Sequence, residues 1–276
     1  MKCFLCAFLI SLISVTLFSG EPDKKLHEMG LYPTVKLSLR TCDCSVCQAE
    51  ANKSVGSGFI VRSDKCVEGI FKDKYLNVVL TAAHNIEHAI PPIKIVVGKY
   101  TDFSEIDGFE EFDSIVYQQD KNLDIAVMLF LSEKQMYTAK LKVDKKLYLG
   151  EKVIRFGFGF GDDIRFDEGK ITSVKTIIPE LMAGKGRMNA HTVIGDSGGP
   201  VYDDEYNVIG ITHAIRANGN YIHTKQSYFV RTNDVKTWNE SINNIIGFVY
   251  KKSDALPNAT LFNLWLLDHQ IIGEKK

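Results

Sequence analysis

The stretch Gly195-Asp196-Ser197-Gly198-Gly199-Pro200 is the most informative part of this 276-residue sequence. Glycines on both sides of a serine favour a tight loop, because glycine adopts backbone conformations that other residues avoid. In such a loop the backbone N–H groups of Gly195 and Ser197 can converge on one point, where they would stabilise an oxyanion. The segment therefore predicts a nucleophilic serine beside an oxyanion hole.

A histidine and an aspartate are placed to complete such a site. Thr81-Ala-Ala-His84 directly follows one apolar run, and Asp124 directly precedes another. Attack by a serine on an acyl group needs an imidazole base within hydrogen-bond reach and a carboxylate that fixes the tautomer of that imidazole. His84 and Asp124 are 40 residues apart, and Asp124 and Ser197 are 73 apart. We therefore predict a catalytic triad of His84, Asp124 and Ser197.

Short apolar runs rich in Val, Ile, Phe and Tyr alternate with polar clusters from Ser54 onward, a pattern typical of β-strands. The predicted strands are Val55–Val61, Tyr75–Leu80, Ile93–Val97, Ile125–Leu131, Lys152–Phe160, Lys170–Thr176, Val208–Ile211 and Tyr228–Arg231. The better helical candidates are a short turn over Ala82–Ala89 and a segment from about Asn233 to Ile246, and the apolar patch Leu261–Leu267 is a further one. The sequence thus predicts an all-β fold with a C-terminal α-helix.

The three motifs, in the order His, Asp, Ser, resemble the trypsin-like (chymotrypsin-fold) serine peptidases. Val55-Gly-Ser-Gly-Phe-Ile-Val61 resembles the first strand of the HtrA/Deg-type and related bacterial branches, and Asn207-Val-Ile-Gly-Ile211 resembles the strand after the nucleophile. The likeness covers roughly residues 54–245. It implies two antiparallel six-stranded β-barrels, the first supplying His and Asp and the second supplying Ser.

The resemblance, together with the patterns on either side of it, divides the chain into segments. They are a signal peptide at 1–20, a lead-in with a cysteine cluster at 21–53, a peptidase domain at 54–245 and a C-terminal extension at 247–276. Within the peptidase domain we expect barrels at about 54–145 and 146–232, followed by a helix at about 233–246. About 30 residues after the peptidase domain are too few for the PDZ domain that HtrA proteins append.

The resemblance also implies the chemistry. Ser197 attacks the scissile carbonyl, His84 accepts its proton and passes it to the leaving amine, and Asp124 orients the imidazolium. The N–H groups of Gly195 and Ser197 form the oxyanion hole. We predict a serine endopeptidase that acts on polypeptides through an acyl-enzyme and needs no metal or organic cofactor. The alternative is a catalytically silent binding or adhesion module, but such a module has no need for all of these groups.

A competing motif shares one of these residues. His84-Asn-Ile-Glu87-His88 matches H-x-x-E-H, in which two histidines on one helical face bind zinc and the glutamate activates water. However, Pro91-Pro92 ends the helix within a turn, and the serine hypothesis explains the same histidine together with two distant segments. The metallopeptidase therefore remains a remote alternative.

The residues before and after the nucleophile predict the substrate pocket. His191 lies six residues before Ser197, where trypsin has its lysine-attracting carboxylate, so a Lys/Arg preference is not expected. Thr192 resembles the glutamyl-endopeptidase branch, whose pocket also uses a histidine after Gly-Ile; here Thr212 comes between that pair and His213. The predicted pocket of His191, Thr192, Thr212 and His213 leaves both an acidic and a small or aliphatic P1 residue open.

Asp196 needs a partner of its own. Trypsin-type zymogens carry an Ile-Val-Gly-Gly-like activation site, whose new amino group pairs with the acid before the serine. No such motif precedes Val55. We expect an internal arginine such as Arg165 or Arg187, or neighbouring backbone, to pair with Asp196, and a protease that is competent without N-terminal activation. A cut after Arg40 is the alternative.

The N-terminus predicts export. Lys2 precedes the mostly apolar run Phe4 to Phe18, which is followed by the small residues Ser19 and Gly20. An uncleaved anchor is the alternative, although a membrane-spanning helix needs about 20 residues. We expect a secreted, periplasmic or extracellular protein without stable membrane association once the signal is cleaved.

Four cysteines follow the predicted signal: Cys42, Cys44, Cys47 and Cys66. In an exported chain an even number favours disulfides, here two, while four thiolates would also suit a tetrahedral zinc site. The charge is balanced, with 33 Lys and Arg against 34 Asp and Glu and a net charge of -1. A chain without a basic field is not expected to bind nucleic acid.

Overall fold

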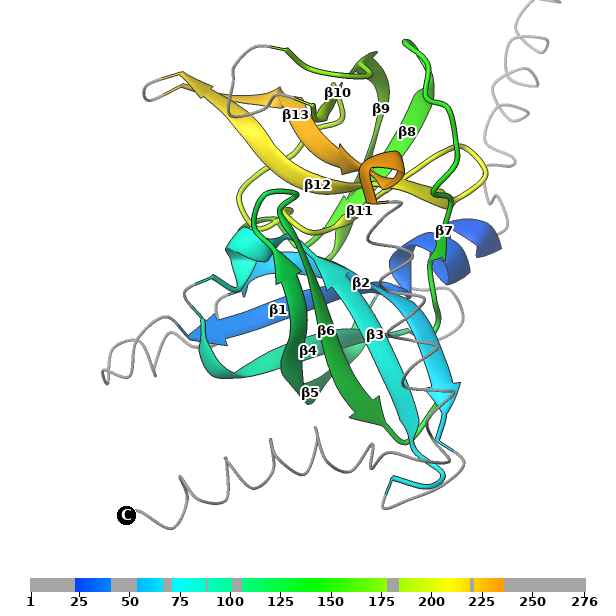
Figure 1. The fold of residues 1–276 in the computed structure, drawn as a ribbon. Helices are drawn as coiled ribbons and strands as arrows, with labels where there is room; N and C mark the ends of the chain where they lie inside the picture. Colours follow the sequence, from blue (N-terminus) through cyan, green and yellow to red (C-terminus); the bar gives the residue numbers. More distant parts are fainter. Residues whose placement is uncertain are drawn as a thin grey trace, which may run out of the picture.

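The computed structural model describes residues 23–40, 54–66, 71–87, 89–100, 106–177, 184–218 and 221–235. These residues form two β-barrels, one above the other in Figure 1, with only short helical turns. The predicted all-β fold of two six-stranded antiparallel barrels is confirmed. No helix within the described ranges has the length and the apolar character needed to cross a membrane.

The first barrel is closed and antiparallel, with the strand order β1-β2-β3-β6-β5-β4. Its strands are β1 (Thr34–Arg40), β2 (Ser54–Lys65), β3 (Tyr75–Thr81), β4 (Ile90–Tyr100), β5 (Ile106–Asp120) and β6 (Ile125–Ser132). Aliphatic side chains fill its interior, among them Val35, Ile60, Val79, Ile95 and Met128, all of them completely buried.

The first barrel begins earlier than predicted. Strand β1 lies in the segment 21–53, which we had expected to be an irregular lead-in, and it pairs with both β2 and β4. Val35, Leu37 and Leu39 alternate with polar residues and are buried, which is the period-2 pattern of a strand with one face in the core. Without β1 the barrel would stay open, so these residues belong to the peptidase domain.

The second barrel has the order β11-β8-β9-β10-β13-β12 and is closed by pairing of β11 with β12. Its strands are β8 (Lys152–Gly157), β9 (Arg165–Ser173), β10 (Gly186–Met188), β11 (Pro200–Tyr202), β12 (Asn207–Asn218) and β13 (Tyr221–Arg231). The two-residue strand β7 (Lys140–Leu141) adds to β12 in parallel. Strand β8 ends at Gly157, short of the predicted Phe160, where the chain turns into the 3-10 helix η3 (Gly159–Gly161).

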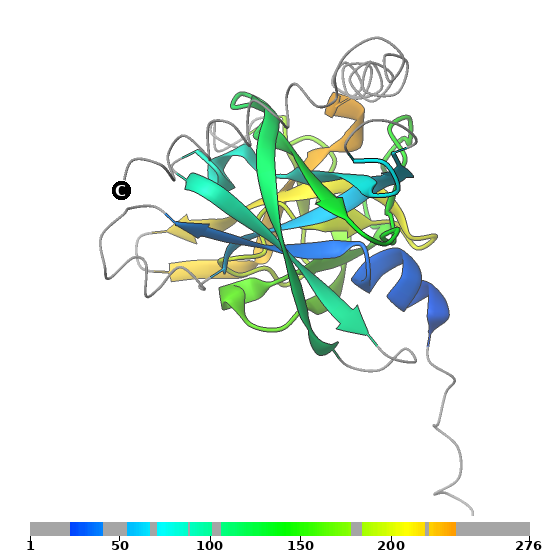
Figure 2. The same ribbon diagram turned by 90° about the horizontal axis from the view of Figure 1, so that it is seen from below.

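One hydrophobic cluster joins the barrels. It contains Phe59 and Leu80 from the first barrel and Phe156, Tyr202 and Ile211 from the second, all buried. The π-helix η1 (Leu26–Leu31) packs its apolar side chains against the same cluster. Seen from below, the first barrel lies in front of the second, with η1 at their side (Figure 2). The shared core fixes the position of one barrel against the other, and with it the cleft between them.

Several predictions concern residues outside the described ranges. These are the signal peptide at 1–20, Cys42, Cys44, Cys47 and the extension at 247–276. Cys66, at the end of β2, carries a free thiol. Of the predicted C-terminal helix, the described residues include only the start, which lies in the 3-10 turn η5 (Thr232–Val235). The free thiol of Cys66 does not agree with a disulfide at that residue, whereas pairing among Cys42, Cys44 and Cys47, the zinc alternative and the helix remain predictions.

Candidate active site

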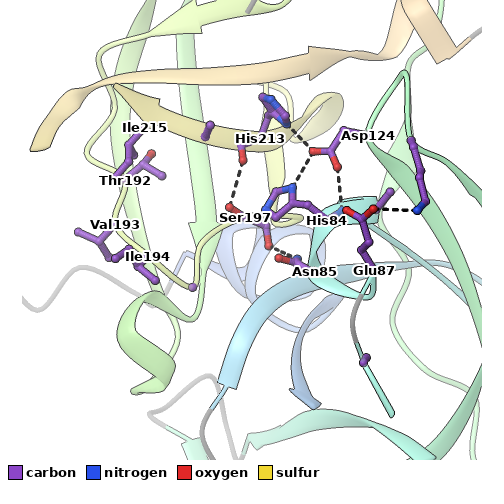
Figure 3. A pocket seen from close by; sticks show the side chains of 15 residues that line it. His84, Asn85, Glu87, Asp124, Thr192, Val193, Ile194, Ser197, His213 and Ile215 are labelled. Atoms are coloured by element: carbon purple, nitrogen blue, oxygen red, sulfur yellow. Dashed lines mark hydrogen bonds and ion pairs between the residues drawn. The ribbon is translucent and has the colours of Figure 1, made fainter. Parts of the chain in front are cut away.

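The structure brings His84, Asp124 and Ser197 together in the cleft between the barrels (Figure 3). His84 lies on the 3-10 turn η2 (Ala83–Asn85) directly after β3, and Asp124 directly precedes β6. Strands β3 and β6 are paired neighbours in the first barrel, so the two side chains meet at the same end of the sheet. Ser197 comes from the loop before β11 in the second barrel.

Asp124 is held in place by hydrogen bonds to both of its oxygens. Its Oδ2 lies 2.8 Å from Nδ1 of His84, and its Oδ1 accepts the backbone N–H of His84 at 2.9 Å. Its Oδ2 also contacts Nδ1 of His213. Burial alone would raise the pKa of the Asp124 carboxyl, but the bonds from His213 and His84 outweigh burial and hold the pKa well below its usual range. Asp124 is therefore ionised and keeps the proton of His84 on Nδ1, which leaves Nε2 free to act as a base.

The nucleophile loop has the shape that the glycines predicted. Gly195 and Gly198 have φ values of +98° and +86°, in the left-handed region, and a Cβ on Gly198 would lie 2.2 Å from the carbonyl oxygen of Ser57. The Ile194 carbonyl accepts the N–H of Phe160 at 2.6 Å, so the Gly195 N–H of that trans peptide points to the opposite side. Among the described residues, no protein acceptor takes the N–H of Gly195 or Ser197. Both donors are available to an oxyanion.

Asp196 pairs with an internal arginine, but not with either candidate from the sequence. Its Oδ1 lies 2.7 Å from Nη1 of Arg155, and the two side chains are 0% and 1% exposed. Arg187 instead donates to Thr172, and Arg165 stacks over Phe160. Burial raises the pKa of Asp196, and the guanidinium of Arg155 opposes that rise. An internal arginine therefore provides the counter-charge of Asp196.

The predicted substrate-pocket residues separate into two pairs. Thr192 and His213 line the cleft, whereas His191 and Thr212 do not. The backbone N–H of His191 donates to Asp167. Thr212 is fully buried, and its backbone bonds to Gly198 and Gly199 behind the nucleophile. Although His213 lines the cleft, its ring is bound to Asp124 and is not placed as part of a wall for the P1 side chain.

Two residues that the sequence analysis did not single out tie the nucleophile loop to the first barrel. Ser57 Oγ donates to the Gly195 carbonyl at 2.7 Å and accepts the N–H of Phe158 at 2.8 Å. Asn85 Nδ2 donates to the Ser197 carbonyl at 2.8 Å. A serine inside the apolar run 55–61 was the available signal for Ser57, because a buried hydroxyl needs hydrogen-bond partners.

Replacement of Ser57 by alanine is expected to weaken both folding and the oxyanion loop. The change leaves the Gly195 carbonyl and the Phe158 N–H without their partner, at a cost of about 1–3 kcal/mol in the free energy of unfolding. We expect kcat for peptide hydrolysis to fall on the order of 10-fold through misplacement of Gly195. Ser63→Ala is the control, because Ser63 lies on the same strand and its Oγ accepts the Met136 N–H. Equal kcat in the two variants, measured alongside urea unfolding, would contradict this role.

The H-x-x-E-H motif is not assembled as a metal site in the part that the structure describes. Glu87 forms an ion pair with Lys121 at 2.7 Å on the rim of the cleft, and His88 lies outside the described residues. In the described ranges, metal-ligating atoms from three side chains come within 4.8 Å only at His84, Asp124 and His213. There Nδ1 of each imidazole already contacts Asp124, so the cluster has an explanation within the triad.

Two barrels with a serine, a histidine and an aspartate meeting between them define the class of trypsin-like peptidases. The chain belongs to this family, since residues 56–211, more than half of its length, match the trypsin-like peptidase domain. Among solved structures it is similar to the protease domain of MamO from Magnetospirillum magneticum in its apo form. The TM-score is 0.57 with 16% sequence identity, over 77% of this chain and 98% of that one, a likeness that shows the fold alone. No curated protein sequence matches the chain.

Proposed function

We propose that the protein is an exported serine endopeptidase that hydrolyses polypeptides through His84, Asp124 and Ser197 by way of an acyl-enzyme. The observation that carries the proposal is the contact of Asp124 with both the ring and the backbone of His84, across the cleft from a serine flanked by two free N–H donors. Membership of the peptidase family supports a polypeptide substrate. The apolar N-terminal run supports export.

The proposed reaction begins with rotation of the Ser197 hydroxyl. In the structure Oγ donates to the His213 carbonyl at 3.1 Å, so it turns toward Nε2 of His84 when a substrate binds. Oγ then attacks the scissile carbonyl while its proton passes to Nε2, and the carboxylate of Asp124 stabilises the imidazolium. The N–H groups of Gly195 and Ser197 bind the oxyanion. His84 gives the proton to the leaving amine, and water repeats the sequence to release the acyl group.

The lining of the cleft supports an uncharged P1 residue. The cavity has a volume of about 670 Å³, and aliphatic residues Val193, Ile194, Ala214 and Ile215 line it on the nucleophile side together with Thr192 (Figure 3). The charged lining residues are on the other side of the cleft. There Glu87 and Lys121 neutralise each other, and the carboxylate of Asp124 is already bound to the ring of His84. Neither a cationic nor an acidic P1 side chain would find a counter-charge, so we propose a small or aliphatic P1.

Cleavage of a peptide library is expected to show this preference. We expect kcat/KM for Ala, Val or Leu at P1 to exceed that for Lys or Glu by about 100-fold, because an unpaired charge is costly to bury. Ile215→Ala should widen the cavity and raise the ratio of Phe to Ala cleavage about 10-fold. Ile177→Ala is the control, since Ile177 is 79% exposed and does not line the cavity. A strong preference for Lys, Arg or Glu would refute the assignment.

Hydrolysis of casein in the presence of inhibitors tests the proposed function against its two alternatives. A serine endopeptidase should be inactivated by a fluorophosphonate and unaffected by a chelator. A zinc peptidase using His84, Glu87 and His88 should lose activity with the chelator. A silent binding module should not hydrolyse casein under any condition.

A further inference from the structure

The carboxylate of Asp124 is shared by two imidazoles. His84 and His213 each place Nδ1 against the same oxygen, Oδ2, while Oδ1 accepts the backbone N–H of His84. Since each ring can donate a proton from Nδ1, the carboxylate accepts three N–H groups and is held in a single orientation. The Asp124 side chain is 9% exposed, so water has little access to take the place of either ring.

His213 touches all three members of the triad. Its ring lies edge-on to the ring of His84, with centroids 5.8 Å apart and an interplanar angle of 78°. Its Nδ1 contacts Asp124, and its backbone carbonyl accepts the Ser197 hydroxyl at 3.1 Å. Fixing this one residue therefore fixes both the carboxylate and the resting place of the nucleophile (Figure 3).

A backbone irregularity aims His213 into the cleft. Along β12, Thr212 pairs with Phe229 and Ala214 pairs with Tyr228, so His213 is an extra residue between two consecutive pairs. Such a bulge turns the side chain of the extra residue away from its regular direction, and bulges are frequent beside active sites. In the glutamyl-endopeptidase pattern the histidine directly follows Gly-Ile, whereas His213 comes one residue later in this chain. The bulge is the physical reason why His213 reaches Asp124.

We infer that His213 is a positioning residue for the triad, which holds Asp124 by a hydrogen bond from Nδ1 and thereby orients His84 for proton transfer. This inference rests on the proposed function. It assigns the His213 side chain a bond to Asp124 and no contact with the substrate, so loss of this side chain should lower kcat and leave KM nearly unchanged.

Two substitutions of His213 by amide side chains distinguish a positioning role from a merely structural one. In His213→Asn the side-chain NH₂ lies near the position of Nδ1 and can donate to Asp124, whereas in His213→Gln the amide is one bond further out. We expect kcat to fall on the order of 10- to 100-fold in His213→Ala and His213→Gln, and to stay within about 5-fold of the wild type in His213→Asn. His27→Ala is the matched control, the same change at a histidine on η1 that does not line the cleft, and should change kcat less than about 2-fold.

Proton NMR provides a readout that does not depend on turnover. Two imidazole N–H groups bound to one carboxylate should give two strongly downfield resonances in the wild type, one of which is lost in His213→Asn. If the resonances behave in this way but no variant hydrolyses peptides, the proposed function fails and the hydrogen-bond network stands. If His213→Ala keeps wild-type kcat, if only KM changes, or if His213→Asn is no better than His213→Gln, the positioning role is overturned.

Discussion

Ser197→Ala is expected to lower kcat for peptide hydrolysis by about 10⁴-fold or more and to leave thermal unfolding nearly unchanged. The activity is lost because Ser197 Oγ is the nucleophile of the proposed reaction. The fold is spared because, within the part of the chain that the structure describes, Ser197 Oγ makes one hydrogen bond, to the His213 carbonyl. Measurement of steady-state kinetics together with a melting curve checks both parts.

The control for this experiment is Ser114→Ala. Ser114 also donates one hydrogen bond, to the Ile93 carbonyl, but it is buried in the first barrel away from the cleft. Its replacement should leave kcat unchanged. A double variant Ser197→Ala and His84→Ala should lose little more than Ser197→Ala alone, because the two groups act as one unit. Substantial activity in Ser197→Ala would contradict the assignment of the nucleophile.

Arg155→Met is expected to have the largest effect on stability. The change leaves the Asp196 carboxylate buried without its counter-charge, which costs about 3–5 kcal/mol in the free energy of unfolding. Asp196 directly precedes Ser197 and its Oδ2 accepts the N–H of Val193, so loss of its partner should also disorder the oxyanion loop. We expect kcat to fall by more than the loss of folded protein explains. Urea unfolding and hydrolysis rates measured on the same samples test this.

The pH dependence of the Arg155→Met variant has a defined sign. Burial already raises the pKa of Asp196, and without the guanidinium of Arg155 only the Val193 N–H and the charge of Arg165 oppose that rise. Above about pH 4 the unfolded chain releases the proton of this carboxyl, whereas the folded variant still holds it. The free energy of unfolding therefore falls as pH rises from about 4 to the raised pKa of the folded state. It should be more stable at about pH 5 than at about pH 8.

Arg62→Met is the matched control for Arg155→Met. Arg62 forms an ion pair with Asp64 at the same 2.7 Å separation, but the two side chains are 40% and 35% exposed. An exposed pair contributes about 0–1 kcal/mol, so the control should unfold almost like the wild type. Equal destabilisation of the two variants would show that burial of the Arg155–Asp196 pair has no special role.

The Arg155–Asp196 pair also bears on activation. In trypsin-type zymogens the acid before the serine gains its partner only after cleavage frees an amino group. Here a fully buried guanidinium provides the positive charge from within the second barrel. The pair supports the interpretation that the nucleophile loop is formed without N-terminal processing.

The sequence predicted the strands whose residues are densely apolar, and missed those with a weaker pattern. Strands β3 and β6 are apolar along almost their whole length because the barrel interior and the shared core cover both faces. Strand β5 has one buried residue among its 15 and carries several acidic residues, so it gave no long apolar run. Strands β10 and β11 have three residues each, too few to show a period.

The meeting of His84, Asp124 and Ser197 in the cleft was predictable because each lies in a motif with its own local signal. Arg155, Ser57 and the position of His213 were not, because each depends on contacts between distant segments. Ser57 meets Gly195 across 138 residues, and His213 meets Asp124 across 89. Such contacts follow from how the barrels dock and from the bulge in β12, which local sequence patterns do not record.

Reaction with a fluorophosphonate, followed by intact-mass measurement and peptide mapping, tests the central claim most directly. A serine activated by His84 and Asp124 beside two free N–H donors should form one adduct per chain, on Ser197. The adduct should be absent from Ser197→Ala and from heat-denatured protein, and a chelator should not prevent it. An unreactive wild-type protein, or an adduct that persists in Ser197→Ala, would contradict the account.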